Sequence, residues 1–191
     1  MRYFFAAAFF FVLFASPAGA QSRNQNWAWC EGGDPVLSLK GCTALIQSIS
    51  ETRNNLAIAH SLRGITYSDN GDFDRAIADY EQTLKLNPEL ATALNSLAWD
   101  LATMPAADRR DGPRAVQLAE RALALNDREA GFFDSAAAAY AKTGRFADAI
   151  RAQKKGIELL RQAGGMPAAA IDDYERRLQL YENNRPFHRS R

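Results

Sequence analysis

Histidine, serine and paired acidic side chains are the residues of this sequence that could carry catalysis, but their spacing does not form a catalytic site. His60 is followed by Ser61, and neighbours at i and i+1 on a helix do not face each other, so they lack the geometry of a base and its nucleophile. Asp172 and Asp173 point apart on a helix, as on a solvated face rather than in a glycosidase pair. No glycine-rich phosphate loop ending in Lys-Ser or Lys-Thr occurs. We therefore predict a protein that is not an enzyme and has no cofactor.

The composition excludes several other classes of protein. The chain has 2 His and 2 Cys, too few soft ligands for an all-protein zinc or iron–sulfur site, so we expect no metal. Its 23 Lys and Arg are balanced by 22 Asp and Glu, which gives no electrostatic footprint for nucleic acid or an anionic membrane surface. With 47% hydrophobic and 24% charged residues, the 191-residue chain has the composition of a folded protein of one domain or at most two.

The segment 1–20 has the pattern of a secretory signal peptide. Arg2 precedes an apolar run over 3–15, and Ala18-Gly19-Ala20 supplies the small-x-small ending at which such peptides are cut. An uncleaved anchor is the alternative, but the apolar run reaches only roughly 20 Å as a helix, short of a bilayer core near 30 Å. We therefore expect a periplasmic or secreted protein that begins at Gln21 and has no stable membrane insertion.

Export would place Cys30 and Cys42 in an oxidising compartment, where an even number of thiols is expected to pair. Closing a loop of about a dozen residues constrains the unfolded chain by roughly 3 kcal/mol. A redox-active pair more typically has the spacing C-x-x-C, and a metal site would need partners that this chain does not supply. We therefore expect a structural disulfide.

A pattern of small and large residues recurs along the middle of the chain. A small residue is followed three positions later by a large one at Gly64 and Tyr67, Ala98 and Leu101, and Ala137 and Tyr140. The small residues lie 34 and then 39 positions apart, and a second series, Ala76, Ala115 and Ala149, runs at 39 and then 34. Both series fit a 34-residue unit with five extra residues in a loop between Leu101 and Ala115. Each unit then holds two amphipathic helices that bury their apolar faces by stacking on the next unit.

This pattern resembles the tetratricopeptide repeat (TPR), a pair of helices with small and large residues at fixed offsets. The unit 57–90 matches best, through Gly64, Tyr67, Asn70-Gly71-Asp72-Phe73, Ala76, Tyr80 and Leu86-Asn87-Pro88. It departs from the pattern at His60, where a bulky residue is usual, and at Arg63, where Leu is usual. The unit 91–129, which carries the insertion, and the unit 130–163 depart further, at Ala119, Asp127, Gln153 and Gly156. The resemblance implies an all-α, TPR-type right-handed superhelix of helix-turn-helix repeats over 57–163.

The N-terminal end of such an array needs a cover, and the segment 21–56 is expected to supply it. Asp34-Pro35 is a helix cap followed by a first-turn proline, so we expect one helix from about 35 to 49. The disulfide would staple this helix to a strand-like approach at 27–29. The apolar stripe of the helix is expected to be Val36, Leu39, Cys42, Leu45 with Ile46, and Ile49.

The C-terminal end is expected to be covered by a capping helix within 164–182. Its inner face would hold Ile171, Tyr174, Leu178 and Tyr181, and its wet face Asp172, Asp173, Glu175, Arg176 and Arg177. The polar and basic tail, 183–191, is expected to be a short solvated end rather than a binding motif.

The resemblance also implies a function, because TPR proteins generally bind peptides or protein partners in a concave groove lined by the first helix of each unit. Carried over position by position, the groove residues are Ile58, Ser61 and Ile65 in the first unit, Thr92, Asn95 and Trp99 in the second, and Gly131, Asp134 and Ala138 in the third. A clamp for a terminal carboxylate is not expected, because only Asn95 fits one. Trp99 either anchors a partner or packs against the inserted turn at 103–113.

We therefore expect a non-catalytic adaptor of the bacterial cell envelope, a monomer that binds a protein or peptide partner and no nucleic acid. The alternative is a receptor for a small ligand or glycan that uses Trp27, Trp29 and Trp99, since aromatic faces bind sugars and apolar groups.

Overall fold

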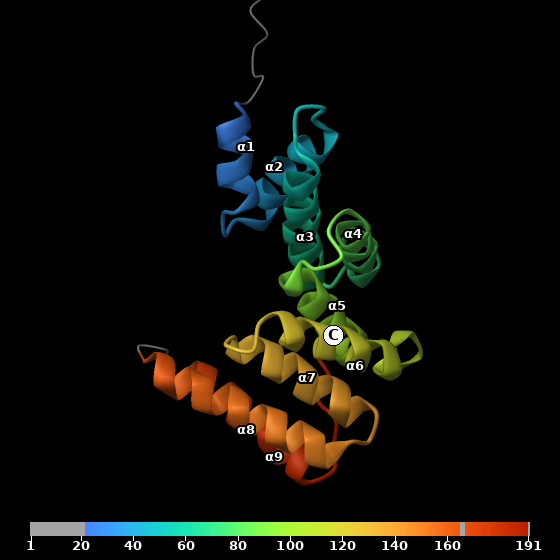
Figure 1. Cartoon of the computed structure of the whole chain (residues 1–191), viewed down its shortest axis with the longest axis vertical. Helices are drawn as coiled ribbons and strands as arrows, with labels where there is room; N and C mark the ends of the chain where they lie inside the picture. Colours follow the sequence, from blue (N-terminus) through green and yellow to red (C-terminus); the bar gives the residue numbers. More distant parts are fainter. Residues whose placement is uncertain (1–21, 165–166, 191) are drawn as a thin grey trace, which may run out of the picture.

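The computed structural model describes residues 22–164 and 167–190, and every regular element in these ranges is helical (Figure 1). The helices are α1 Arg23–Cys30, α2 Pro35–Gln47, α3 Arg53–Asp69, α4 Phe73–Leu86, α5 Ala91–Thr103, α6 Gly112–Leu125, α7 Ala130–Lys142, α8 Phe146–Ala163 and α9 Ala168–Glu182. A short 3₁₀ helix, η1, covers Ala107–Arg109. The predicted all-α fold is confirmed, whereas the predicted signal peptide, 1–20, lies outside the described residues.

The helices α3 to α8 form three consecutive hairpins, α3 with α4, α5 with α6, and α7 with α8, which stack on one another. Figure 1 shows the stack descending from α3 through α5 and α7 to α9. A single hydrophobic core runs through it from Ala76 in α4 to Tyr181 in α9. Because each hairpin buries only part of its apolar surface by itself, the stacking of neighbours supplies the rest.

The small residue predicted in the first helix of the first unit is needed for close packing. A Cβ atom on Gly64 would lie 2.7 Å from the ring of Tyr80, which is buried against it. Tyr80 projects from the partner helix α4, so any larger side chain at position 64 would push α3 and α4 apart. The spacing of small and large residues therefore reflects the contact between the two helices of the hairpin.

The turns inside the first and third hairpins share one geometry. Gly71 and Gly144 have φ of +77° and +78°, a left-handed conformation that glycine adopts without steric strain. In both turns the next amide closes the helix end, with Asp72 N donating to Tyr67 O and Arg145 N donating to Tyr140 O. The second hairpin has no such glycine, and its longer turn holds η1 and a bond from Asp111 N to Leu101 O.

The N-terminal segment differs from the prediction of one helix and a strand-like approach. Residues 27–29 belong to helix α1, which begins after Ser22, whose Oγ accepts from Gln25 N. α2 ends at Gln47 because Ser48 is extended, and as a result Ile49 is exposed instead of continuing the apolar stripe. Val36, in the first turn of α2, is exposed as well.

Gly41 explains how α1 and α2 can lie so close together. A Cβ atom at this position would lie 2.4 Å from Asn26 O and 2.7 Å from Cys30 N, both in the backbone of α1. The glycine therefore has a packing role that outweighs its low helix propensity.

The C-terminal tail is not a solvated end. Residues 183–190 leave α9 through Asn184, whose φ is +53°, and run back behind α7 to α5 (Figure 1, red). The amide of Arg189 donates to Thr103 O at 2.9 Å, so the tail is bonded to the end of α5. The prediction failed because the tail is polar in composition, while two of its side chains have specific partners in the array. No helix among the described residues is both long and apolar enough to cross a membrane.

Candidate functional site

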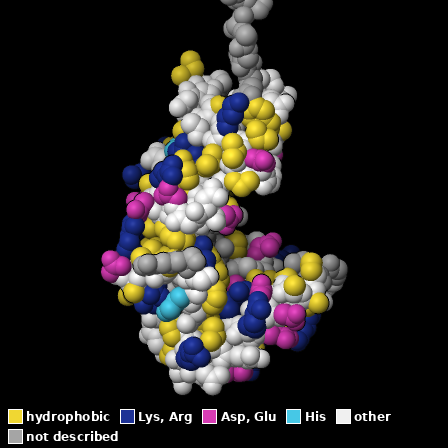
Figure 2. Space-filling view, turned by 180° about the vertical axis from the view of Figure 1, so that it is seen from behind, with side chains coloured by type: hydrophobic (Ala, Val, Ile, Leu, Met, Phe, Trp, Pro, Cys, Tyr) yellow, Lys and Arg dark blue, Asp and Glu magenta, His cyan; other side chains and the backbone are white. Residues whose placement is uncertain are grey.

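The first helices of the three hairpins, α3, α5 and α7, carry the predicted groove residues, and we call the side that they form the concave face. Figure 2 shows the molecule hollowed between the lobe of α1 to α3 and the lobe of α7 to α9. Three of the predicted residues, Ile65, Asn95 and Trp99, line one cleft of about 120 Å³ between α3 and α5. The other residues around this cleft are Ser68, Asp69, Tyr80, Ser96, Asp100 and Arg189.

Trp99 is half-buried, and its ring has a contact that the sequence did not predict. The ring of Phe187 in the tail stacks on the indole, with centroids 5.7 Å apart. The guanidinium of Arg177, from α9, lies 5.6 Å from the centroid of Trp99 and 5.5 Å from that of Phe187. Trp99 is therefore in contact with the chain's own tail through an aromatic stack and a shared cation–π contact.

Arg189 is the second contact between the tail and the concave face. Its Nη2 donates to Asp100 Oδ1 at 2.5 Å, and its Nη1 donates to Ser68 Oγ at 3.1 Å. The guanidinium also lies 4.6 Å from the ring centroid of Phe73, at the start of α4. One arginine thus joins the ends of α3 and α5 to the tail through a planar fork of donors.

Asp100 is a charged group set deep in the array. Its side chain is 1% exposed, and burial raises the pKa of its carboxyl, although Arg189 and the hydroxyl of Ser68 act in the opposite direction. Ser68 Oγ donates to Asp100 Oδ1 at 2.8 Å, while Asp100 Oδ2 is buried without a hydrogen-bond partner among the described residues. A carboxylate held in this way favours a cation beside it.

Three predicted groove residues do not lie on an open surface. Asp134 is buried because α9 covers it: Arg177 Nε and Gln153 Nε2 each donate to Asp134 Oδ1 at 2.8 Å. Burial raises the pKa of Asp134, again opposed by Arg177. Ala138 and Ser61 are buried too, at 2% and 4% exposure. Sequence positions alone could not show that a capping helix occupies the third unit's share of the face.

The remaining predicted residues stay accessible. Ile58 is half-buried on α3, and Thr92 and Gly131 are exposed near the starts of α5 and α7. These three positions are therefore the predicted groove residues that lie outside both the tail contact and the cover of α9.

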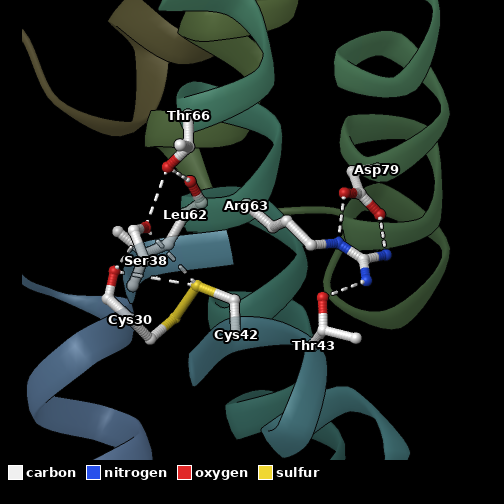
Figure 3. The surroundings of a disulfide bond; sticks show 8 residues. All are labelled: Cys30, Ser38, Cys42, Thr43, Leu62, Arg63, Thr66 and Asp79. Carbon is white, nitrogen blue, oxygen red and sulfur yellow. Dashed lines mark hydrogen bonds and ion pairs between the residues drawn. A yellow bond between two sulfur atoms is a disulfide. The ribbon is translucent and has the colours of Figure 1, made fainter. Parts of the chain in front are cut away.

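The departures from the repeat pattern at His60 and Arg63 form a polar cluster with Asp79 of α4 (Figure 3, which labels Arg63 and Asp79). His60 Nδ1 donates to Asp79 Oδ1 at 2.8 Å, and Arg63 makes two bonds of 2.8 Å to the same carboxylate. Burial alone would raise the pKa of Asp79, but the hydrogen bonds from Arg63 and His60 outweigh it and hold the pKa below its ordinary value. His60 therefore bonds α3 to α4.

The predicted disulfide between Cys30 and Cys42 is present and joins α1 to α2 (Figure 3). Beside it, Ser38 Oγ lies 3.1 Å from Cys30 O and 2.9 Å from Thr66 Oγ1. Arg63 Nη1 donates to Thr43 Oγ1 at 3.1 Å. These bonds fix the stapled pair of helices onto α3, and the surroundings are those of a structural disulfide.

The tryptophans of the alternative glycan site do not converge. Trp27 packs beside the disulfide, Trp29 lies under Lys40 Nζ at 4.7 Å, and Trp99 lines the cleft on α5 with neither of them. Nor does any group of three or more His, Cys, Asp and Glu in the described ranges have the arrangement of a metal site.

Four residues of this site were missed at the level of sequence: Asp100, Arg177, Phe187 and Arg189. One signal was available for Asp100, which is the only charged residue in the helix Ala91–Thr103 and therefore needs a partner. A second was the single aromatic residue in an otherwise polar tail. Arg177 was assigned to the wet face of α9, but its side chain is 13% exposed.

Comparisons with known proteins agree with this geometry. The family model of the tetratricopeptide repeat matches residues 57–90. Among solved structures, MamA (41 to the end) from Desulfovibrio magneticus RS-1 has a TM-score of 0.57 and 17% identity, over 84% of this chain and 93% of that one. The structure named MamA RS-1 ArsTM double mutant gives the same TM-score and identity, over 84% and 92%. No curated protein matches the sequence.

Residues 57–90 are therefore a tetratricopeptide repeat, and the fold of the chain is similar to that of MamA. A TPR array is in general a scaffold for contacts between proteins.

Proposed function

We propose that the protein is a non-catalytic, monomeric scaffold of the bacterial cell envelope that binds a protein or peptide partner on its concave face. The observation that carries this is the cleft between α3 and α5, where Ile65, Asn95 and Trp99 meet. It combines an apolar side chain, an amide and an indole, the groups that hold an extended peptide by its backbone and one anchoring side chain.

Asn95 has the orientation that such a role needs. Its Oδ1 is buried and has no hydrogen-bond partner within the described residues, so it can accept an N–H from a peptide that enters the cleft. Thr92 is exposed three positions earlier on α5, on the same stripe of the helix.

The envelope location rests on two features that support each other. The segment 1–20 has the pattern of a signal peptide, and the disulfide of Cys30 and Cys42 is the kind of bond that persists in an oxidising compartment. Intact mass of the protein from the envelope fraction should show a chain that begins at Gln21. A full-length, membrane-embedded species as the sole form would overturn this part of the proposal.

Site-specific photo-crosslinking in living cells tests the binding face. A benzoylphenylalanine at Thr92, on the concave face, should give a discrete adduct with a partner protein. The matched control is Gln117, an exposed position on the second helix of the same hairpin, which should give none. Equal adducts at both positions, or none at Thr92, would contradict binding on the concave face.

A further inference from the structure

We propose that the tail 183–190 is an internal ligand of the concave face, and that the partner segment that replaces it is an extended peptide with an aromatic residue followed two positions later by arginine. This inference rests on the proposed function, because it names the chemistry of the partner that the same face takes.

The tail binds through the side chains of two residues in that spacing. Phe187 stacks on Trp99 at 5.7 Å between centroids, and Arg189 bonds to Asp100 and Ser68. His188, between them, is exposed, as are Asn184, Arg185 and Ser190. One backbone bond to the repeat hairpins, from Arg189 N to Thr103 O, adds to these contacts and requires only an extended chain. The tail is therefore held as a short peptide ligand is held, by alternate side chains and the backbone.

The residues that bind the tail belong to the helices of the array and of α9. Trp99, Asp100 and Thr103 belong to α5, Ser68 to α3, and Arg177 to α9, where its bond to Asp134 fixes it beside the aromatic pair. Asp100 is the residue that selects arginine. Its Oδ1 lies next to the hydroxyl of Ser68, and the planar guanidinium of Arg189 donates to both of these oxygen atoms at once, whereas an ammonium group offers one point charge.

The site also has room for a ligand longer than the tail. Beyond Arg189 lies an open pocket of about 620 Å³, lined by Asp69, Asn70, Phe73, Pro105 and Ala106 among others. Ser190 is already at its edge. A partner peptide that continues past its arginine would enter this pocket, and Asp69 favours further basic residues there.

The tether makes the tail a competitor. The few residues between the end of α9 and Phe187 give a local concentration on the order of millimolar, so a partner must displace the tail to bind. Residues 183–185 bond only to the end of α9, the tail's contacts with α3 and α5 lie at Phe187 and Arg189, and none of the three repeat hairpins includes tail residues in its own helices. The tail can therefore leave while the array stays folded.

The test uses the mature chain, 21–191, and a fluorescein-labelled peptide of residues 183–190 with an amidated C-terminus. Anisotropy titration should show binding to Phe187→Ala and to Arg189→Ala at least tenfold tighter than to the wild-type chain, where the site is occupied. Arg185→Ala is the matched control, since it removes an exposed arginine of the same tail, and it should behave as wild type. Peptides in which Phe187 is Ala, or Arg189 is Lys, should bind at least tenfold more weakly to the Phe187→Ala chain.

Two results would contradict the tail as a ligand. Equal binding of the peptide to the wild-type and Phe187→Ala chains, or no binding to either variant when circular dichroism shows both folded, would mean that the tail is a fixed brace. If one variant fails to fold, the other decides. Adducts at Thr92 without peptide binding would leave the scaffold function in place and overturn the tail as ligand. Peptide binding without any adduct at Thr92 would support the tail as ligand and overturn partner binding at Thr92.

Discussion

Phe187 lies on Trp99, with ring centroids 5.7 Å apart and planes inclined by 29°, and this contact closes the chain's last described segment onto its second repeat. Aromatic pairs of this kind contribute about 0.5–1.5 kcal/mol beyond the area that they bury. A double-mutant cycle of Trp99→Ala and Phe187→Ala, measured by urea unfolding, should give a coupling energy in that range. The same cycle with Arg185→Ala should be additive to within about 0.5 kcal/mol. Additivity of the aromatic pair would show that the stacking is absent in solution.

Arg177 should matter far more for stability than its neighbour Arg176. Arg177 is bonded to the buried Asp134 at 2.8 Å, whereas Arg176 pairs with Asp173 on the surface. Removing one partner of a buried pair leaves an unpaired buried group, so Arg177→Ala should lower the free energy of unfolding by about 3 kcal/mol. Arg176→Ala should change it by less than about 0.5 kcal/mol. Similar effects of the two substitutions in urea titrations would argue against the burial of Asp134 under α9.

Gly41 and Gly33 give a second matched comparison, this time of backbone packing. A Cβ at position 41 would meet α1 backbone atoms at 2.4 and 2.7 Å, whereas one at position 33 would meet nothing within 4 Å. Gly41→Ala should therefore force α1 and α2 apart and destabilise the protein by about 1–3 kcal/mol, even though alanine favours helix. Gly33→Ala should stay within about 0.5 kcal/mol of wild type. Thermal unfolding of the two variants, with the disulfide intact, checks this. A stabilised Gly41→Ala variant would be incompatible with the close packing of α1 against α2 at Gly41.

The Asp79 cluster predicts a loss of stability in acid. The pKa of Asp79 in the folded protein lies below its ordinary value of 3.8, so its contribution is fully present above about pH 4 and is lost as the pH falls through the folded pKa. Asp79→Asn should lower the unfolding free energy by about 3 kcal/mol at pH 7, where Arg63 and His60 lose their partner. Unfolding curves measured from about pH 2.5 to about pH 7, which spans the carboxyl range, should show this difference in unfolding free energy shrinking below about pH 4. A constant difference over the whole range would mean that the carboxylate does not carry the effect.

The repeat architecture could be predicted from sequence because its signals are local and periodic. Gly64 and Tyr80 form one contact between the helices of a hairpin, and Gly71 forms one left-handed turn. Both features lie within a single unit, so its sequence pattern is enough to predict them. The disulfide could be predicted because the chain has only one possible pair of cysteines.

The candidate site was harder to predict because its decisive contacts join positions far apart in the chain. Arg189 meets Asp100 and Arg177 meets Asp134 only after the array has stacked, and no periodic pattern links such residues. The same contacts explain why a tail with a solvated composition is docked, and why the third unit's share of the concave face is closed.

Amide hydrogen exchange at Arg189 tests the central claim most directly, because this amide donates to Thr103 O only when the tail lies on the concave face. NMR of the mature wild-type chain should show this amide exchanging at least about tenfold more slowly than in the free peptide of residues 183–190, with the protection lost in Phe187→Ala. Exchange at the rate of the free peptide in the wild-type chain would contradict a tail that occupies the partner site.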